Sequence, residues 1–508
     1  MARFLAALPI AIAVGAACTA PSVNGLIFAC QSDADCAGGK VCATVSGARG
    51  CVEKGADAGG GGDIRIGMSA AFTGTSANLG TEMRRGVEAY LKSANANGGV
   101  QGGRRVVLEA LDDHYDPATA VANTEQLLDM PTAALLADGG PPSTPAKAGP
   151  KGVFAIFGNV GTPTMVPTFP IITNAHVVFF APFTGSQKFL RDGTHSPYSF
   201  NFRAGYFDET AAMLDYLFTT RAPQVAGYEH IMVFAQNDAY GDAGYNGLVN
   251  AYKAAGRQPA LPTDTSICRV GYTRDDLSSV PAAVTNATTA AAGGAGSGVP
   301  YNLESIFLAA KAANTTATVA IVMVDTYAIG AQFIKGIKDY LNGDVAHAST
   351  LDVVFIHLSF VGPDSLSQAL AGGTYKSVID KSTKSYAEGV MVTQVVPSYS
   401  AQSAGIVQYR NDMKAFDQGA FNSTSLEGYL AAALFVKGLK QTPSLDSDAL
   451  VKTFEESVQN VDLGTGVLVG FSPTDHQASH FVWLSQMDQN AAYSFPYRWD
   501  PTKKIQPN

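Results

Sequence analysis

Short apolar runs alternate with amphipathic stretches along most of this chain, and this alternation limits the possible folds more than any other feature. IRIGMSAAF, residues 64–72, is typical of a buried strand, and TEMRRGVEAYLKSAN, residues 81–95, is typical of a helix. In the helical stretch the apolar residues recur every three or four positions. Strands that alternate with helices predict a parallel sheet covered by helices. We therefore expect an α/β fold.

The alternation continues well beyond the length that a single hydrophobic core usually fills. The chain has 508 residues, and two α/β units of ordinary domain size account for that length. Residues 141–152 and 282–300 lack hydrophobic periodicity, and we expect both to be surface insertions. The other predicted strands are RRVVLEAL, VFAIF, HIMVFAQ, TVAIVMV, DVVFIHL and GVMVTQVV.

Residues 1–18 have the features of an export signal. Arg3 precedes an apolar stretch at residues 4–14, and small residues follow as far as Cys18. The apolar stretch is too short to span a bilayer as a helix. Because the residues before Cys18 resemble a bacterial lipobox, we expect Cys18 to carry a lipid. An ordinary cleaved signal without lipid is the alternative.

Four cysteines crowd into the next segment, at Cys30, Cys36, Cys42 and Cys51. In an exported chain this spacing predicts two disulfides that hold a small knot, with three possible pairings. A zinc site is disfavoured because no C-x-x-C pair is present. A Gly-rich linker follows, so residues 19–62 are predicted to be a Cys-rich knot and a spacer. The remaining Cys268 is expected to be a buried bystander thiol.

The sequence contains none of the common enzyme motifs. It has no G-x-S-x-G elbow, no H-E-x-x-H pair and no P-loop. His476 and His480 have helix-like spacing, but Pro473 and the strand-like FVWL predict a turn and a strand, where the two side chains do not converge on a metal. A net charge of −9 argues against a nucleic-acid partner. We expect no catalytic residue, no metal and no cofactor.

Small polar residues follow several of the predicted strands. Open α/β sheets bind ligands at the carboxyl ends of their strands, beside helix N-termini that favour anions and carbonyl oxygens. GNVGTPT, residues 158–164, places two threonine hydroxyls in such a loop, and its glycines let a ligand approach the backbone. A helix-capping turn without a ligand is the alternative for this loop. Comparable loops are SAAFTGTSANLG, APFTGS, QNDAYGDAGY and DTY.

These loops, taken in order, resemble a known family. The stretches IRIGMSAAFTGTSANLG, GNVGTPT, APFTG, QNDAYGDAGYNG, SLEGYLAA and GFSPTDHQASH are similar to type I periplasmic solute-binding proteins, in the branch of the leucine/isoleucine/valine receptors of ABC transporters. The resemblance covers residues 63–490 and implies two Rossmann-like lobes joined by a hinge of three crossovers. It places residues 63–203 and 396–466 in the first lobe, and residues 204–395 and 467–508 in the second.

The resemblance also implies which residues contact the ligand between the lobes. GNVGTPT and APFTGS match the loops that hold the ligand's carboxylate or carbonyl, and the other positions match strand-end loops that touch its remaining parts. The implied contacts are Phe72, Thr73, Thr162, Thr164, Thr184, Ser186, Tyr240, Asp325, Thr326, Tyr327 and Ser359.

One loop departs from the family pattern. Leucine-type receptors place a glutamate after a second-lobe strand to pair with the ligand's ammonium group, whereas this chain has HLSFVGPD, with Ser359 and Phe360 at that place. A buried ammonium needs an anionic or strong acceptor partner. Either Asp325 or Glu209 supplies it, or the ligand is an amide, a carboxylate or an aromatic acid.

The sequence therefore predicts an exported, lipid-anchored solute-binding protein in the periplasm or at the cell surface. Its expected partners are a small polar ligand, an ABC transporter permease, and a membrane reached only through the lipid. The main rival is a ligand-sensing surface lipoprotein that signals through a partner protein. An enzyme on the same sheet and a structural protein with an inactive cleft are more distant rivals.

Overall fold

The computed structural model describes residues 41–45, 48–52, 62–130, 148–187, 191, 197–221, 231–255, 267–289 and 301–508. The chain divides into two units, residues 1–62 and residues 63–508. In the first unit, β1 (Val41–Val45) and β2 (Ala48–Val52) pair antiparallel and place Cys42 opposite Cys51. Cys18, Cys30 and Cys36 lie outside the described residues, so lipidation and the disulfides stay predictions.

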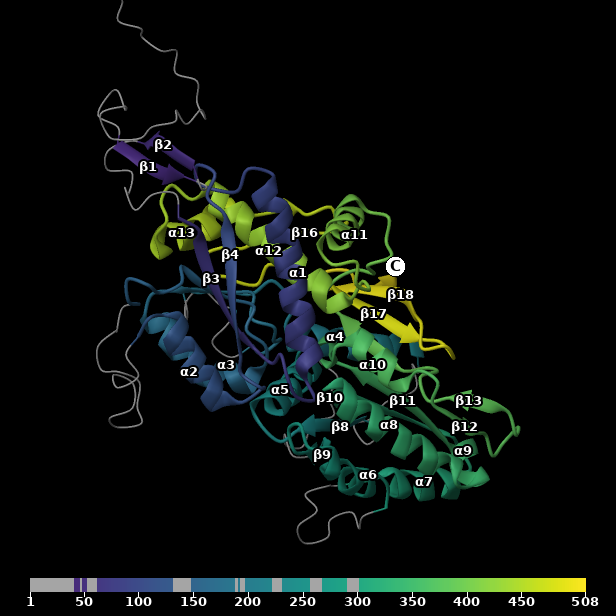
Figure 1. Ribbon diagram of the computed structural model, residues 1–508. Helices are drawn as coiled ribbons and strands as arrows, with labels where there is room; N and C mark the ends of the chain where they lie inside the picture. Colours follow the sequence, from purple (N-terminus) through teal and green to yellow (C-terminus); the bar gives the residue numbers. More distant parts are fainter. Residues whose placement is uncertain are drawn as a thin grey trace, which may run out of the picture. The chain divides into compact units, whose positions relative to one another are not determined.

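The described residues of the second unit form two large sheets and two short two-stranded ones (Figure 1). The first sheet has five parallel strands, and the helices that follow them belong with it as the first lobe. In spatial order its strands are β4 (Val106–Asp112), β3 (Ile64–Ala70), β5 (Ala155–Phe157), β6 (Val178–Phe180) and β7 (Ser199–Phe200). Its helices are α1 (Ala77–Ala96), α2 (Pro117–Leu127), α3 (Thr162–Asn174), α11 (Ala404–Phe416), α12 (Ser423–Gln441) and α13 (Ser447–Ser457), and β15 (Val461–Asp462) pairs with β16 (Leu468–Val469) beside them.

The helices α1 and α12 lie against each other although more than 300 residues separate them (Figure 1). Their backbones approach closely at Gly86, where a Cβ atom would lie 1.8 Å from the carbonyl oxygen of Ser425. Leu79, Met83 and Val87 are buried on the same side of α1. This contact fixes the start of α12 within the first lobe.

The second sheet has eight strands and forms the second lobe with its own helices. Five strands are parallel, and three that come last in the chain extend the sheet antiparallel. In spatial order they are β19 (Lys504–Pro507), β18 (Tyr493–Asp500), β17 (Val482–Met487), β14 (Met391–Gln394), β11 (Leu351–His357), β10 (Ala317–Val324), β8 (Ile231–Gln236) and β9 (Cys268–Tyr272). The helices are α4 (Tyr206–Tyr216), α5 (Ala239–Ala254), α6 (Val280–Thr288), α7 (Leu303–Ala312), α8 (Tyr327–Asn342), α9 (Val345–Thr350) and α10 (Pro363–Leu370), with a hairpin of β12 (Thr374–Lys376) and β13 (Thr383–Ser385).

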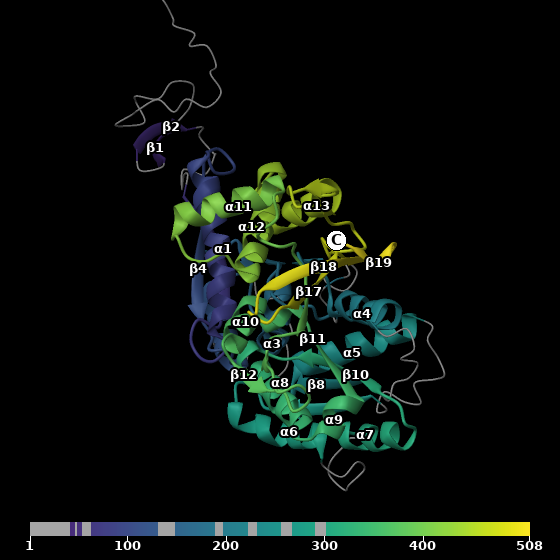
Figure 2. The same ribbon diagram turned by 90° about the vertical axis from the view of Figure 1, so that its right-hand side faces the viewer.

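The chain passes between the two lobes three times. It leaves the first sheet after β7 and enters α4, which packs against β14 and β17 of the second sheet. It returns between β14 and α11, which packs against α1, and crosses again between β16 and β17. Figure 2 shows β17 and β18 in yellow beside the strands and helices of the second lobe. We call these three passages, residues 201–205, 395–403 and 470–481, the hinge.

The prediction of a surface insertion at residues 282–300 is wrong in part. Residues 280–288 form the helix α6, which buries Ala283 and Ala287 against the second lobe. Alanines four positions apart make a narrow apolar face that hydrophobic periodicity does not reveal. Cys268 is buried in β9 and is a free thiol. Among the described residues, no helix is both long and apolar enough to cross a membrane.

Candidate ligand-binding site

The carboxyl ends of the strands of both sheets meet in one place. The loop after β3 reaches the loop after β9, because the hydroxyls of Thr75 and Ser76 donate hydrogen bonds of 2.6 and 2.7 Å to the same oxygen of Asp275. Asn78 also donates to Ser365 across the lobes at 3.2 Å. We call this contact between the lobes the interlobe seam.

Aromatic rings fill the centre of the seam. Phe360, in the loop after β11, is completely buried. Its ring centroid lies 4.5 Å from that of Tyr240 in the second lobe. It also lies 5.4 Å from Phe183 and 6.3 Å from Tyr115 in the first lobe. The hydrophobic core therefore continues from one lobe into the other through Phe360.

The predicted hydroxyl groups of the first lobe are bonded to one another. Thr162 and Thr184 share a hydrogen bond of 2.8 Å, and the hydroxyl of Thr184 lies 3.4 Å from that of Tyr206. The amide of Ser186 donates to the Thr184 hydroxyl at 3.1 Å. The structure thus brings Thr162, Thr184 and Ser186 together from two strand-end loops.

Thr164 belongs to the same loop but is directed differently. The helix α3 begins inside GNVGTPT, and the Thr164 hydroxyl donates to the backbone carbonyls of Val160 and Gly161 at 2.6 and 2.9 Å. Gly161 has a φ of 103°, and a Cβ atom there would lie 2.2 Å from the Tyr115 ring. Only glycine fits this turn, which holds α3 against the seam.

Phe72 and Thr73 lie at the outer side of the seam. The amide of Phe72 and the hydroxyl of Thr73 donate to the Asp112 carboxylate at 2.9 and 2.6 Å. Thr73 also contacts the His114 ring and is exposed. These two predicted contacts are therefore separate from the buried threonine group.

The predicted second-lobe residues surround a buried carboxylate. Tyr240 donates its hydroxyl to the backbone carbonyl of Asp325 at 3.1 Å. The Asp325 carboxylate lies 2.9 Å from Nδ1 of His357, and burial raises the pKa of Asp325 although His357 opposes this. The Thr326 hydroxyl has no hydrogen-bond partner among the described residues. Tyr327 is half-buried beside them.

Ser359 lies in a group of buried charges at the hinge end of the seam. Its amide and hydroxyl donate to the Glu209 carboxylate at 2.7 and 3.0 Å, and the Thr393 hydroxyl donates to Glu209 at 2.5 Å. Arg203 donates to the Ser359 hydroxyl, and its guanidinium lies 4.4 Å from the centre of the Phe183 ring. Burial raises the pKa of Glu209, while Arg203 acts in the opposite direction.

Glu427, on α12, completes this group. One of its oxygens lies 3.5 Å from Nε of Arg203. Burial raises the pKa of Glu427 to about 7, although Arg203 opposes the shift. Sequence reasoning considered Glu209 but missed Arg203 and Glu427. The stretch SLEGYLAA contributed to the family resemblance, yet nothing in it indicates that its glutamate faces the seam.

The two spaced histidines have separate carboxylate partners. His476 lies 3.1 Å from Glu455, whereas His480 lies 3.2 Å from Asp208 and 3.0 Å from Asp475. Burial lowers the pKa of His480, but the two carboxylates outweigh burial and raise this pKa to about 9. Within the part of the chain that the structure describes, no cluster of three or more His, Cys, Asp or Glu side chains has a geometry suited to a metal.

Two α/β lobes, a three-passage hinge and a polar seam between strand ends define a class of protein, the type I periplasmic binding proteins. Residues 63–145 and 361–492 match the family model described as a periplasmic binding protein. The fold class predicted from the sequence is therefore confirmed.

Individual relatives agree with this assignment. A possible leucine/isoleucine/valine-binding protein from Rhodopirellula baltica has a similar structure, with a TM-score of 0.63, 26% sequence identity, and coverage of 85% of this chain and 95% of that chain. The branched-chain amino acid transporter substrate-binding protein from Streptococcus pneumoniae, solved in complex with isoleucine, has a TM-score of 0.57 at 12% identity and covers 88% of this chain and 100% of its own.

A curated relative matches this chain over a shorter stretch of sequence. Leu/Ile/Val-binding protein homolog 2 from Brucella abortus is 28% identical over 127 residues, which are 25% of this chain and 28% of that protein. This chain thus spans little more than a quarter of that relative's length. The predicted resemblance to type I periplasmic solute-binding proteins of the leucine/isoleucine/valine receptor branch is confirmed. The family is one of exported substrate-binding proteins rather than enzymes.

Proposed function

We propose that this protein is an extracytoplasmic solute-binding protein that captures a small polar ligand in the interlobe seam and delivers it to an ABC importer. The observation that carries this proposal is the meeting of strand-end loops from both sheets, which bury the hydroxyls of Thr162, Thr184 and Tyr206 at one place. Small-molecule sites of α/β proteins lie at this edge of the sheet.

Binding requires the seam to open, because Phe360 fills its centre in the closed arrangement. A hinge of three short passages permits the lobes to separate as rigid bodies. The ligand then replaces contacts of the Phe360 ring and reaches the threonine hydroxyls. The proposed contacts are Phe72, Thr73, Thr162, Thr164, Thr184, Ser186, Tyr240, Asp325, Thr326, Tyr327 and Ser359.

A melting-temperature screen of the purified full chain against amino acids, amides and organic acids tests ligand capture. A ligand at about a hundred times its dissociation constant stabilises the folded state by about 2.7 kcal/mol, which a melting curve detects. We expect Thr162→Val to weaken binding of the hit about fivefold, because a hydrogen bond is worth about 1 kcal/mol. Thr168→Val is the matched control, since Thr168 is buried in the same helix and donates only to backbone carbonyls.

Delivery to an importer needs a separate experiment. Crosslinking of the ligand-loaded protein in membranes, followed by mass spectrometry, is expected to recover an ABC permease. Recovery of a signalling kinase without a permease would replace transport with sensing. Absence of any ligand in the screen, on protein freed of bound molecules by unfolding and refolding, would contradict capture itself.

A further inference from the structure

The part of the first unit that the structure describes is one β-hairpin. Its strands β1 and β2 form a sheet of their own, which no other strand of the described residues joins (Figure 1). A single hairpin of two strands is at best marginally stable in water, and very small units usually depend on disulfides or a metal. A cross-link between the two strands would supply the missing stability.

The register of the hairpin identifies the residues that such a cross-link can join. Val45 lies opposite Ala48, so that a loop of two residues connects the strands. The residues that flank a two-residue loop form a hydrogen-bonded pair, and such pairs alternate with non-hydrogen-bonded pairs along antiparallel strands. Cys42 and Cys51 are the fourth pair from the loop, and they are therefore a non-hydrogen-bonded pair.

A non-hydrogen-bonded pair is well placed for a disulfide. In such a pair the two Cα atoms are about 4.5 Å apart, and side chains are closer than in a hydrogen-bonded pair. A disulfide joins residues whose Cα atoms are about 4.4 to 6.8 Å apart. Formation of the hairpin alone thus brings Cys42 and Cys51 within bonding range, without any contribution from the rest of the chain.

We infer that Cys42 and Cys51 form a disulfide across the β1–β2 hairpin. The sequence alone leaves three pairings of the four cysteines open, and this bond excludes two of them. Cys30 and Cys36 lie outside the described residues, so their bond to each other follows by elimination. The Cys42–Cys51 bond lies before the two lobes and is independent of ligand capture.

The bond forms by exchange with the disulfide of an external thiol–disulfide oxidoreductase. The two cysteine thiols lose two protons and two electrons, and the external disulfide takes them up and becomes two thiols. Exported proteins encounter such oxidants, and the periplasmic binding proteins are an exported family. Cys268 does not compete, because burial raises the pKa of its thiol to about 12 and exchange requires a thiolate.

This pairing replaces the predicted knot by two consecutive rings. Residues 42–51 close one ring and residues 30–36 close the other, and the two rings share no residue. The excluded pairings would place one loop across or inside the other. A proteolytic cut after Arg49, inside the ring of residues 42–51, would leave the lobes covalently joined to the segment that precedes them. The link to the expected lipid anchor would therefore survive that cut.

A tryptic digest of the full exported chain tests the pairing. Trypsin cuts after Lys40, Arg49 and Lys54, and thereby places Cys42, Cys51 and the other two cysteines of the segment on three different peptides. Free thiols are blocked before denaturation, so that no exchange occurs during the digest. Mass spectrometry of the unreduced digest then shows which peptides are joined.

We expect residues 41–49 to be joined to residues 50–54 and to no other peptide. Either excluded pairing would join both of these peptides to the one that ends at Lys40. Separate peptides that carry the blocking reagent would mean that no bond forms. Both of these results would overturn the inference. The expected result does not depend on whether Cys18 carries a lipid, because Cys18 precedes Lys40.

A single substitution tests the same bond from its other side. Cys42→Ser should free Cys51 alone, so that a thiol reagent labels residues 50–54 and leaves the peptide that ends at Lys40 unlabelled. Label on the latter peptide would contradict the pairing. Cys268→Ser is the control, because it removes a thiol of β9 and should leave the peptide map unchanged. Should Cys42→Ser not be exported, the wild-type digest decides.

Native proteolysis measures what the bond does for the hairpin. Closing a ring of ten residues raises the equilibrium constant for hairpin folding about 100-fold. Trypsin should therefore cut native Cys42→Ser/Cys51→Ser after Arg49 up to about 100-fold faster than the wild type. The cut after Lys381, at the exposed turn of the β12–β13 hairpin, is the control and should not change. Equal rates after Arg49 would show that no bond holds the hairpin.

Ligand binding separates these results from the proposed function. The double variant should bind any ligand found in the melting-temperature screen as tightly as the wild type, because both lobes lie within residues 63–508. A peptide map that contradicts the Cys42–Cys51 bond would leave ligand capture intact. A screen without any ligand would leave the peptide map intact.

Discussion

The centre and the hinge end of the interlobe seam are built differently. At the centre, rings pack around Phe360 and the threonine hydroxyls satisfy one another. At the hinge end, Arg203, Glu209 and Glu427 are buried together, and the Gln394 amide oxygen and two nitrogens of the Arg203 guanidinium have no hydrogen-bond partner among the described residues. The two regions therefore differ in their effect on stability. Satisfied groups stabilise closure, whereas unsatisfied buried groups oppose it until another group pairs with them.

The largest expected change in the free energy of unfolding comes from a substitution at the centre of the interlobe seam. Phe360→Ala removes a fully buried ring that contacts Tyr115, Phe183 and Tyr240, and we expect the free energy of unfolding to fall by about 3–5 kcal/mol. Urea unfolding followed by fluorescence measures it. Phe495→Ala, at a partly buried ring of β18, is the control and should cost less than half as much. A loss below about 1 kcal/mol at Phe360 would mean that the seam is not packed.

The hinge end should instead show a strong dependence on pH. The pKa of Glu427 is raised from 4.5 to about 7, so between these values the folded protein binds more protons than the unfolded chain. The free energy of unfolding therefore falls as pH rises from about 4.5 to about 7, by roughly 3 kcal/mol at most. Arg203, Glu209 and Arg191 are the charged groups that act on this carboxyl.

Unfolding of wild type and Glu427→Gln across pH 4.5 to 8 isolates this contribution, because other titrating groups are common to both proteins. The variant should lose this part of the slope and become the more stable protein near pH 8. Phe360→Ala should keep the wild-type slope. Parallel curves for wild type and Glu427→Gln would remove the distinction between the two ends of the seam.

A smaller effect is expected from the threonine hydroxyls. Thr184→Val leaves the Ser186 amide without its acceptor and the Thr162 hydroxyl without its partner, which should cost about 1–3 kcal/mol. Thr164→Val removes only bonds to backbone carbonyls and should cost less. The comparison is made by urea unfolding. If the two variants were equally stable, the Thr162–Thr184 bond would not contribute to closure.

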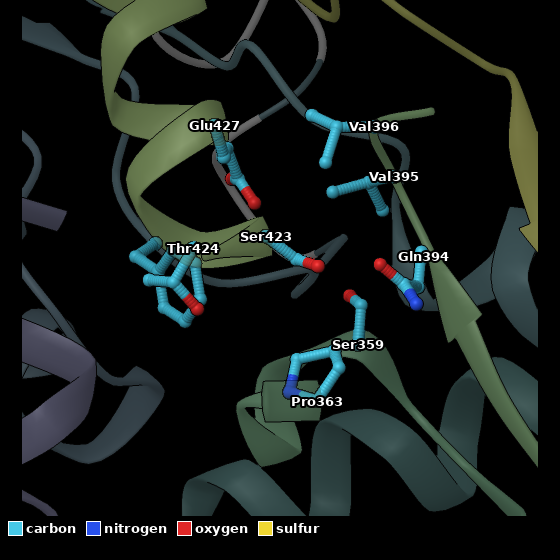
Figure 3. Close-up of a pocket in the computed structure, with 9 residues that line it drawn as sticks. Ser359, Pro363, Gln394, Val395, Val396, Ser423, Thr424 and Glu427 are labelled. Carbon is cyan, nitrogen blue, oxygen red and sulfur yellow. The ribbon is translucent and has the colours of Figure 1, made fainter. Parts of the chain in front are cut away.

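The sequence alone predicted the α/β fold because buried parallel strands read as continuous apolar runs. It also predicted the strand-end loops, since glycine and threonine follow those runs in GNVGTPT and APFTGS. It did not predict that Gln394 and Glu427 meet. Gln394 interrupts the apolar run GVMVTQVV, and Glu427 lies in an alanine-rich helix, so neither local pattern indicates that both residues line one cavity between the lobes (Figure 3). Their approach depends on how α12 packs on α1, more than 300 residues earlier.

The smallest effect is expected at the rim of the seam, where one carboxylate joins the lobes. Asp275 has a φ of 54° and one of its oxygens accepts both the Thr75 and Ser76 hydroxyls. Asp275→Asn keeps an oxygen and suits the left-handed backbone equally well, so global unfolding should change by less than about 1 kcal/mol. Amide hydrogen exchange in the loop after β3 should nevertheless become faster, because a neutral acceptor holds the two hydroxyls less strongly. Phe360→Ala provides the contrast, since it should accelerate exchange throughout the seam. Unchanged exchange in Asp275→Asn would show that packing at the centre closes the lobes without help from the rim.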